Sequence, residues 1–280
     1  MRERLSQLNE YTGVDTQEGP KSVIFAGVHG NEQAGIAAFE KLIPTLEISQ
    51  GQLWLIYGNP LAIIRNTRQI DANLNRMFKP EELLSKSETE SYEYRRAKTL
   101  KKQLQKSDVL LDVHGSRTAD SKPFVIAEPN AAELVKFLPV EIVVSGFDEF
   151  EPGGTDYYMN SIGKVGICIE CGYNEDEQSF KIAEEAIFAF LTARGHIERD
   201  AFARKQRNFR LFSMYLTKTN FRRSKPFADF ESVSDNQLLG TDGAAEVKAE
   251  RQGIILFANR DIKNPNEEAF LLAKEAGTLT

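Results

Sequence analysis

Cysteine, histidine and long apolar runs are all scarce in this chain of 280 residues. Two cysteines cannot form the disulfide framework that is typical of small secreted proteins. No apolar run approaches the roughly 18 residues that a membrane-spanning helix needs. Residues 1–13 lack the apolar centre of a signal peptide. We therefore expect a cytoplasmic protein without a membrane partner.

A surplus of basic residues is also missing. The chain has 35 lysines and arginines against 41 acidic residues, so its formal net charge is −6. This balance argues against a nucleic-acid-binding protein with a broad basic surface, but it leaves room for a local basic pocket for an acidic small molecule. Hydrophobic residues (41%) and charged residues (27%) have the shares of an ordinary globular protein.

Strand-like and helix-like stretches alternate along the first two thirds of the chain. The predicted strands are Lys21–Ala26, Gln52–Tyr57, Val109–Val113, Pro123–Ala127, Glu141–Val144 and Val165–Glu170. The predicted helices are Gln33–Leu42, Glu88–Gln105, Ala131–Phe137 and Glu177–Ala193. This alternation favours an α/β sheet that helices cover on both faces.

The pattern changes after Gly195. Short alternating segments such as Phe209–Leu216 and Gly253–Phe257 follow, separated by Gly, Pro, Asn and Asp. Such segments indicate a small β-rich appendage. We therefore predict a catalytic α/β domain over residues 1–200 and a β-rich barrel or sandwich-like appendage over residues 201–280.

Two of the three histidines occupy the same local context, an apolar strand that ends in His-Gly. His29 follows the first predicted strand, with Glu32 three residues on, and His114 ends a later strand. Each histidine alone is best explained as an ordinary polar residue at a strand end. Together with Glu32 they form a known catalytic zinc set that leaves one position open for water. Asp112, on the same strand face as His114, could orient that ligand.

The third histidine, His196, sits just past a predicted helix end and is interpreted as a capping or linker residue.

A long polar stretch, residues 59–78, has neither helical nor strand periodicity and is predicted to be a functional loop. Its arginines and asparagines suit planar recognition of carboxylates. A solvated basic loop is the alternative, and it fits Arg65 best. It fits Asn75 and Arg76 less well, because Leu74 and Phe78 would turn that segment inward.

Glu170 stands near the end of an apolar strand, where burying a carboxylate is costly without a partner or a task. Beside a water molecule on a metal it would act as the general base. The neighbouring Cys168 and Cys171 have the spacing of a redox or zinc pair, but no second pair exists. Positions three apart on a strand face opposite sides, so we expect buried free thiols.

These pieces resemble the aspartoacylase and succinylglutamate desuccinylase family, within the zinc carboxypeptidase-like superfamily. The matching motifs, in the family's order over roughly residues 21–175, are Gly27-Val-His-Gly-Asn-Glu32, Asn59-Pro-Leu-Ala62, Arg68-Gln-Ile-Asp-Ala-Asn-Leu-Asn-Arg76, Asp112-Val-His-Gly115, Gly154-Thr155 and Ile169-Glu-Cys-Gly172. Each motif is weak alone, but jointly they are specific.

The resemblance implies a mixed sheet flanked by helices, with a small C-terminal β-rich domain. It implies one Zn²⁺ per chain, held by His29, Glu32 and His114, with Glu170 transferring protons. It also implies Arg68 near the scissile carbonyl, and Asn75 and Arg76 gripping a substrate carboxylate. The expected activity is hydrolysis of the acyl amide of a small-molecule N-acyl amino acid or a similar small carboxylate.

The chain departs from the family pattern at three places. Asn73 replaces the usual aspartate before Leu-Asn-Arg, Asn160 stands where aspartoacylases carry an arginine, and a pocket tyrosine has no counterpart near Asn264. The last two differences count against N-acetylaspartate as the substrate. Arg117, just after the second histidine motif, is the candidate for a replacement cation that binds substrate.

Two other functions remain open at this point. A carboxypeptidase-like metallopeptidase acting on a small peptide would use the same zinc set. A non-catalytic binding protein could keep the fold, although the intact set of ligands and Glu170 argues against it. The sequence leaves open whether the protein forms a homo-oligomer.

Overall fold

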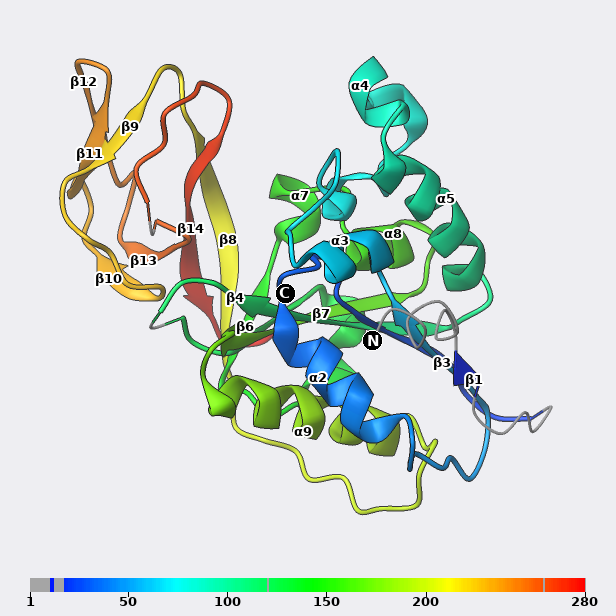
Figure 1. Cartoon of the computed structure of the whole chain (residues 1–280). Helices are drawn as coiled ribbons and strands as arrows, with labels where there is room; N and C mark the ends of the chain where they lie inside the picture. The colour runs from blue at the N-terminus through cyan, green and yellow to red at the C-terminus, as the bar shows by residue number, and fades with distance from the viewer. Residues whose placement is uncertain (1–10, 13–17, 120, 259, 280) are drawn as a thin grey trace.

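One mixed sheet of 11 strands runs through the computed structural model, which describes residues 11–12, 18–119, 121–258 and 260–279 (Figure 1). Its strand order is β1-β3-β2-β4-β7-β5-β6-β8-β14-β13-β10. The strands of this sheet and of a second, smaller sheet are β1 (Tyr11–Thr12), β2 (Lys21–Ala26), β3 (Gln52–Tyr57), β4 (Val109–Ser116), β5 (Phe124–Ala127), β6 (Ile142–Ser145), β7 (Val165–Tyr173), β8 (Arg207–Leu216), β9 (Phe221–Arg223), β10 (Glu231–Val233), β11 (Leu238–Asp242), β12 (Ala245–Lys248), β13 (Gly253–Leu256) and β14 (Glu268–Ala276).

The centre of the sheet is parallel. β2 pairs in parallel with β3 and with β4, and β4 pairs in parallel with β7, whereas β5 is antiparallel to β7. The carboxyl ends of β2, β4 and β7 therefore meet at one edge. The register places Glu170 of β7 opposite His114 of β4. The predicted strands and the mixed α/β sheet are confirmed, with β4 and β7 running a few residues further than expected.

Helices cover both faces of this sheet, as predicted. The helices are α2 (Gln33–Leu42), α3 (Pro60–Arg65), α4 (Lys86–Thr89), α5 (Tyr92–Leu104), α6 (Ala132–Val135), α7 (Phe147–Phe150), α8 (Thr155–Ser161) and α9 (Glu177–Ala193), with 3₁₀ turns at Leu74–Arg76, Glu81–Leu83 and Pro129–Ala131. In Figure 1, α2 and α9 lie together on one face of the sheet, with α5 and α8 on the other. Each face has its own buried core, which includes Phe39 and Phe190 on the first face and Phe25 and Phe78 on the second.

Two of the predicted helices differ from the structure. The predicted helix Glu88–Gln105 is wrong as one helix, because a break separates α4 from α5. The Ser91 side chain accepts a hydrogen bond from the backbone N–H of Tyr94 at 3.0 Å and so caps a new helix. The predicted helix Ala131–Phe137 is shorter than expected, because a 3₁₀ turn that begins at Pro129 takes up its start.

The stretch 59–78 is not a loop throughout, which corrects the sequence-based expectation. It opens with the short helix α3, whose N-cap is Asn59: its side chain accepts a hydrogen bond from Ala62 N at 3.3 Å. Pro60 occupies the first helical turn, where a missing N–H costs nothing. Helices α7 and α8 were also not predicted, since both are short and lack a long apolar period.

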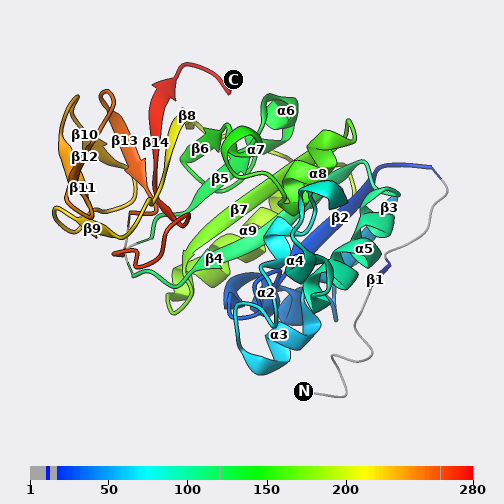
Figure 2. The same ribbon diagram turned by 90° about the horizontal axis from the view of Figure 1, so that it is seen from above.

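The C-terminal part is β-rich, as predicted, and it continues the main sheet. β8 pairs in parallel with β6 and antiparallel with β14, while β9, β11 and β12 form a separate three-stranded antiparallel sheet (Figure 2). The division of the chain at residue 200 stays a prediction. Within the described part of the chain, none of the helices combines the length and apolar character that crossing a membrane requires.

Candidate metal centre and substrate pocket

His29 and Glu32 lie in the tight turn that joins β2 to α2. His29 Nδ1 is 2.7 Å from Glu32 Oε1. Although Glu32 is at the N-cap position of α2, its side chain makes no capping hydrogen bond. Gly30 allows the turn to pack tightly, because a Cβ atom there would lie 2.1 Å from the carbonyl carbon of Ala62. The turn therefore aims Glu32 at the histidine instead of at its own helix.

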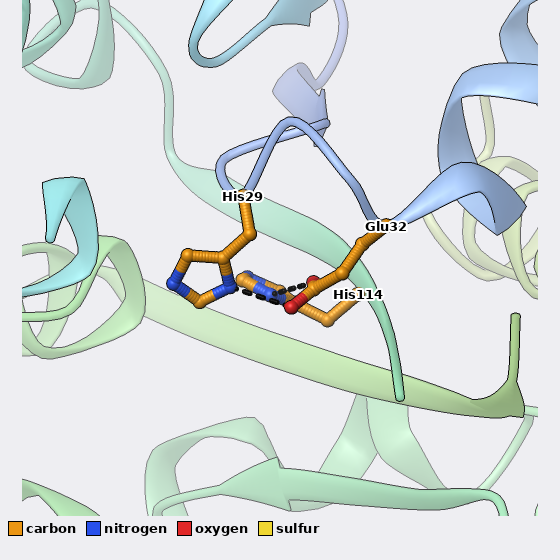
Figure 3. Close-up of side chains that lie close together, drawn as sticks. All are labelled: His29, Glu32 and His114. Carbon is orange, nitrogen blue, oxygen red and sulfur yellow. Dashed lines mark hydrogen bonds and ion pairs between the residues drawn. The ribbon is translucent and has the colours of Figure 1, made fainter. Parts of the chain in front are cut away.

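His114, at the end of β4, completes a group of three. Its Nδ1 atom is 2.9 Å from Glu32 Oε2, so the carboxylate lies between the two imidazoles (Figure 3). All three side chains are buried, and one ligand atom from each lies within 4.8 Å of the others. Two imidazoles and a carboxylate that meet in this way could hold a divalent metal ion, and the set suits zinc.

The Nε2 atom of each imidazole, on the side away from Glu32, lies close to a side-chain oxygen atom. His29 Nε2 is 3.0 Å from Asn73 Oδ1, and His114 Nε2 is 3.0 Å from Asp112 Oδ2. Metal-binding histidines usually have such a partner, which fixes the ring and leaves the other nitrogen free for the metal. The predicted placement of Asp112 beside His114 is confirmed, and Asn73 has the same relation to His29.

Opposing effects set the charges of these ligands. Burial alone would raise the pKa of Glu32, but the imidazoles of His29 and His114 lower it well below its usual range. Burial lowers the pKa of His29, against the pull of Glu32. Burial would also lower the pKa of His114, but Asp112 and Glu32 hold it well above its usual value. Glu32 is thus ionised and His29 is neutral, which are the forms in which a carboxylate and an imidazole bind a metal ion.

Glu170 extends from β7 beside the three ligands. It pairs in register with His114 and lines the same cavity. Burial raises the pKa of Glu170 to about 7, while His114 lowers it and Glu32 raises it further. A carboxyl group with a pKa near neutrality can both accept and return a proton, which is the property that general acid–base catalysis needs.

A cavity of about 830 Å³ opens over the three ligands. It brings together all the site residues predicted from the sequence: His29, Glu32, Arg68, Asn75, Arg76, His114, Arg117 and Glu170. Arg68 Nη1 is 3.1 Å from Glu32 Oε1, and about half of the Arg68 side chain is exposed. The side-chain oxygen of Asn75 accepts a hydrogen bond from Thr155 N at 3.3 Å, so its amide nitrogen remains for a ligand.

Two cavity residues were missed in the sequence. Glu151 directly precedes the Pro-Gly-Gly segment and pairs with Arg76, whereas Glu268 comes from β14 of the C-terminal part. Only the position of Glu151 beside a glycine motif gave a sequence signal. Asn160, the place of a family arginine, is on α8, where it hydrogen-bonds Asp148 and Asn130. It is not among the described residues that line the cavity.

Cys168 and Cys171 are free and buried, as expected. They belong to different hydrophobic cores on opposite faces of β7. Burial raises the pKa of both thiols well above the usual value, so they stay protonated.

Comparison with known proteins agrees with this geometry. Residues 18–194 match the family described as succinylglutamate desuccinylase/aspartoacylase catalytic domain. Succinylglutamate desuccinylase of Shewanella sp. (strain W3-18-1) is 26% identical over 91% of this chain and 83% of its own length. N-acyl-aromatic-L-amino acid amidohydrolase (carboxylate-forming) of Xenopus tropicalis is 28% identical over 54% of this chain and 53% of its own.

The fold has solved counterparts. The crystal structure of succinylglutamate desuccinylase from Vibrio cholerae matches with a TM-score of 0.77 at 20% identity, covering 95% of this chain and 85% of that chain. The family match covers the turn with His29 and Glu32, the strand with His114 and the strand with Glu170. The chain therefore belongs to the succinylglutamate desuccinylase/aspartoacylase family of deacylase hydrolases.

Proposed function

We propose that the protein is a zinc-dependent amidohydrolase that removes the acyl group from an N-acyl amino acid or a similar small carboxylate. One observation supports this most: a buried His-Glu-His set meets beneath a cavity, with Glu170 on the adjacent strand. The names of the relatives agree, since one is a desuccinylase and another an amidohydrolase of N-acyl amino acids.

The metal would be held by His29, Glu32 and His114. Zinc in such a site lowers the pKa of water and polarises a carbonyl group. The donor set present here fits this ion, because Zn²⁺ accepts imidazole nitrogen and carboxylate oxygen in four-coordinate sites. Asn73 and Asp112 hold the two rings so that the Nδ1 atoms face the centre.

Glu170 takes a proton from the attacking water and returns it to the departing amine. Its raised pKa suits both halves of this cycle. Arg68 stabilises the negative charge that develops on the amide oxygen, a contact worth about 2.7–4 kcal/mol where single donors have been removed from other enzymes. Its guanidinium already lies at the edge of the ligand set, near Glu32.

Asn75, Arg76 and Arg117 bind the free carboxylate of the substrate and so position the amide. Arg117 has no ion-pair partner among the described residues, and it lines the cavity. The C-terminal part supplies a wall that includes Phe257 and Glu268, which favours small substrates over peptides. A cytoplasmic location and a homo-oligomeric state stay predictions.

The test combines metal analysis with an assay of N-acetyl, N-formyl and N-succinyl amino acids. We expect about one zinc ion per chain, hydrolysis of at least one substrate and loss of activity after chelation. The His29→Ala variant should lose both zinc and activity. Stoichiometric zinc without any hydrolysis would favour a binding protein, and release of C-terminal residues from small peptides would favour a carboxypeptidase.

A further inference from the structure

The Arg76 guanidinium, expected to attract a substrate carboxylate, already has an acidic partner. Its Nη2 atom is 2.5 Å from Glu151 Oε1, and its Nη1 donates to the backbone carbonyl of Asn75 at 2.8 Å. The Glu151 side chain is only 14% exposed and that of Arg76 29%, so water screens this ion pair weakly. The positive charge of Arg76 is therefore neutralised before any substrate arrives.

A second carboxyl group extends this pair. Glu268, the first residue of β14, hydrogen-bonds Glu151. Two carboxyl groups in contact cannot both be ionised at low cost, so they share one proton. Burial and the contact with Glu151 raise the pKa of Glu268 well above its usual value. Arg76, Glu151 and Glu268 together are thus close to neutral, with a single shared negative charge balancing one guanidinium.

A third acidic residue, Asp148, lies on the same side of the cavity. Asp148 lies on α7, the helix whose C-cap is Glu151, and it also lines the cavity. Burial, with Asp156 and Glu128 nearby, raises the pKa of Asp148 to about 7. Arg117, Lys122 and Arg260 line the cavity too, so repulsion of a carboxylate is confined to the end that holds Glu151 and Asp148. One substrate carboxylate can still bind Arg117 or the remaining N–H groups of Arg76, but a second carboxylate placed beside Glu151 would meet repulsion.

We propose that Glu151 and Glu268 restrict this enzyme to substrates with a single carboxylate, namely N-acyl derivatives of neutral or basic amino acids with an uncharged acyl group. The inference rests on the proposed deacylase function and narrows its substrate class. It sets this chain apart from desuccinylation of glutamate, whose substrate carries three carboxylates. Glu151 and Glu268 act through the charge of Arg76 and are specificity-determining residues.

N-acetylglutamine and N-acetylglutamate give the sharpest test, because they have nearly the same shape and differ in one charge. With the zinc-loaded protein we expect kcat/KM for N-acetylglutamine to exceed that for N-acetylglutamate by about tenfold or more. N-succinylglutamate should be a poorer substrate still. Equal values, or a preference for N-acetylglutamate, would overturn the proposal.

Substitutions of Glu151 and Glu268 test whether these two residues cause the preference for N-acetylglutamine. Glu151→Gln and Glu268→Gln should each move the ratio of the two kcat/KM values toward N-acetylglutamate, by about tenfold for Glu151→Gln. Glu149→Gln is the matched control, since Glu149 lies on α7 two residues before Glu151, is exposed, and pairs with Arg210 outside the residues that line the cavity. An unchanged ratio in Glu151→Gln protein that melts like the wild type would remove this residue from the explanation.

Failure of the deacylase assignment can be told apart from failure of this inference. If no acyl amino acid is hydrolysed, the proposed function falls, and the charge preference is read from binding of the product amino acids. Calorimetric titration with glutamine and glutamate then decides. Tighter binding of glutamine supports the neutralised Arg76, and tighter binding of glutamate contradicts it.

Discussion

At the scale of single residues, the candidate metal centre depends on the contacts that His29 and His114 make on the side away from Glu32. The two histidines present Nδ1 to the centre because Asn73 and Asp112 occupy their Nε2 sides. Thr155 in turn donates its hydroxyl to Asp112 Oδ2 at 2.5 Å. Each of the two histidines is thus oriented by a neighbour that would not itself touch the metal.

Replacing Glu170 by glutamine separates proton transfer from metal binding. Glutamine has almost the same shape but cannot accept a proton, so kcat should fall by about 10²–10⁴-fold. The zinc content should stay at the wild-type level, because Glu170 is not one of the three ligands. Steady-state kinetics and metal analysis of the purified variant provide both numbers. Turnover close to that of the wild type would exclude Glu170 as the proton carrier.

The sequence predicted these residues because their signals are local. His29 follows one apolar strand and His114 lies near the end of another, each before a glycine, and parallel strands end at a common edge. Glu151 and Glu268 were missed because their pairing joins α7 to a strand more than a hundred residues later. No local pattern marks such a pair, since it depends on how the C-terminal strands pack.

At the scale of elements, α5 fixes the shape of the loop between Arg68 and Asn73. Glu93, fully buried on α5, accepts hydrogen bonds from Ile70 N at 2.7 Å, Asp71 N at 3.1 Å and Ala72 N at 3.0 Å. It also accepts one from the Asn59 side chain at 3.1 Å. One carboxylate therefore fixes the loop that lies between Arg68 and Asn73.

We expect Glu93→Gln to loosen this loop. The amide would turn a donor toward backbone N–H groups, at a cost of about 1–3 kcal/mol in the free energy of unfolding. Because Arg68 and Asn73 flank the loop, kcat should also fall. Glu90→Gln, at an exposed position near the end of α4, is the control and should change neither quantity. Thermal melts and kinetics together test this; wild-type behaviour of Glu93→Gln would show that the loop needs no carboxylate.

Two long helices were predicted correctly from the sequence, whereas three short ones were missed. Helices α2 and α9 have long apolar stripes and were predicted with the correct bounds. Helices α3, α7 and α8 have four to seven residues, which is too short for a periodic signal. Asn59 and Pro60 were visible start signals for α3, but the polar residues that follow outweighed them.

At the scale of the whole molecule, the third histidine, His196, lies outside the set of described residues that line the cavity. His196 is fully buried, and its Nδ1 atom lies 3.0 Å from the carbonyl oxygen of Gln50. Its backbone N–H bonds the carbonyl of Leu191, and Gly195 before it has a φ of 76°. This is a Schellman motif that ends α9, so the predicted capping role is confirmed.

A pH dependence of stability follows from this burial. Burial and the nearby Arg194 lower the pKa of His196, although the hydrogen bond to Gln50 opposes them. The unfolded chain, with an ordinary histidine pKa of about 6.5, then binds more protons than the folded chain, so acid favours unfolding. His196 should therefore stabilise the fold fully above that pKa and progressively less as the pH falls below it.

Denaturant unfolding of the wild type and His196→Asn at several pH values between 5 and 8 measures this. Asparagine can keep the hydrogen bond to Gln50 but does not titrate in this range. The wild type should lose its advantage over the variant as the pH falls. A difference in unfolding free energy that is independent of pH would contradict a neutral buried His196.

The pairing of β6 with β8 has a consequence for how such an enzyme can diversify. One continuous sheet contains both β4, which carries His114, and β14, which carries Glu268. We therefore do not expect a hinge motion that separates the C-terminal part from the candidate metal ligands. The proposed preference for one acyl amino acid over another would then depend on side chains carried by one continuous sheet. We expect substitutions along β14 to change the proposed substrate preference and to leave the candidate metal ligands and Glu170 in place.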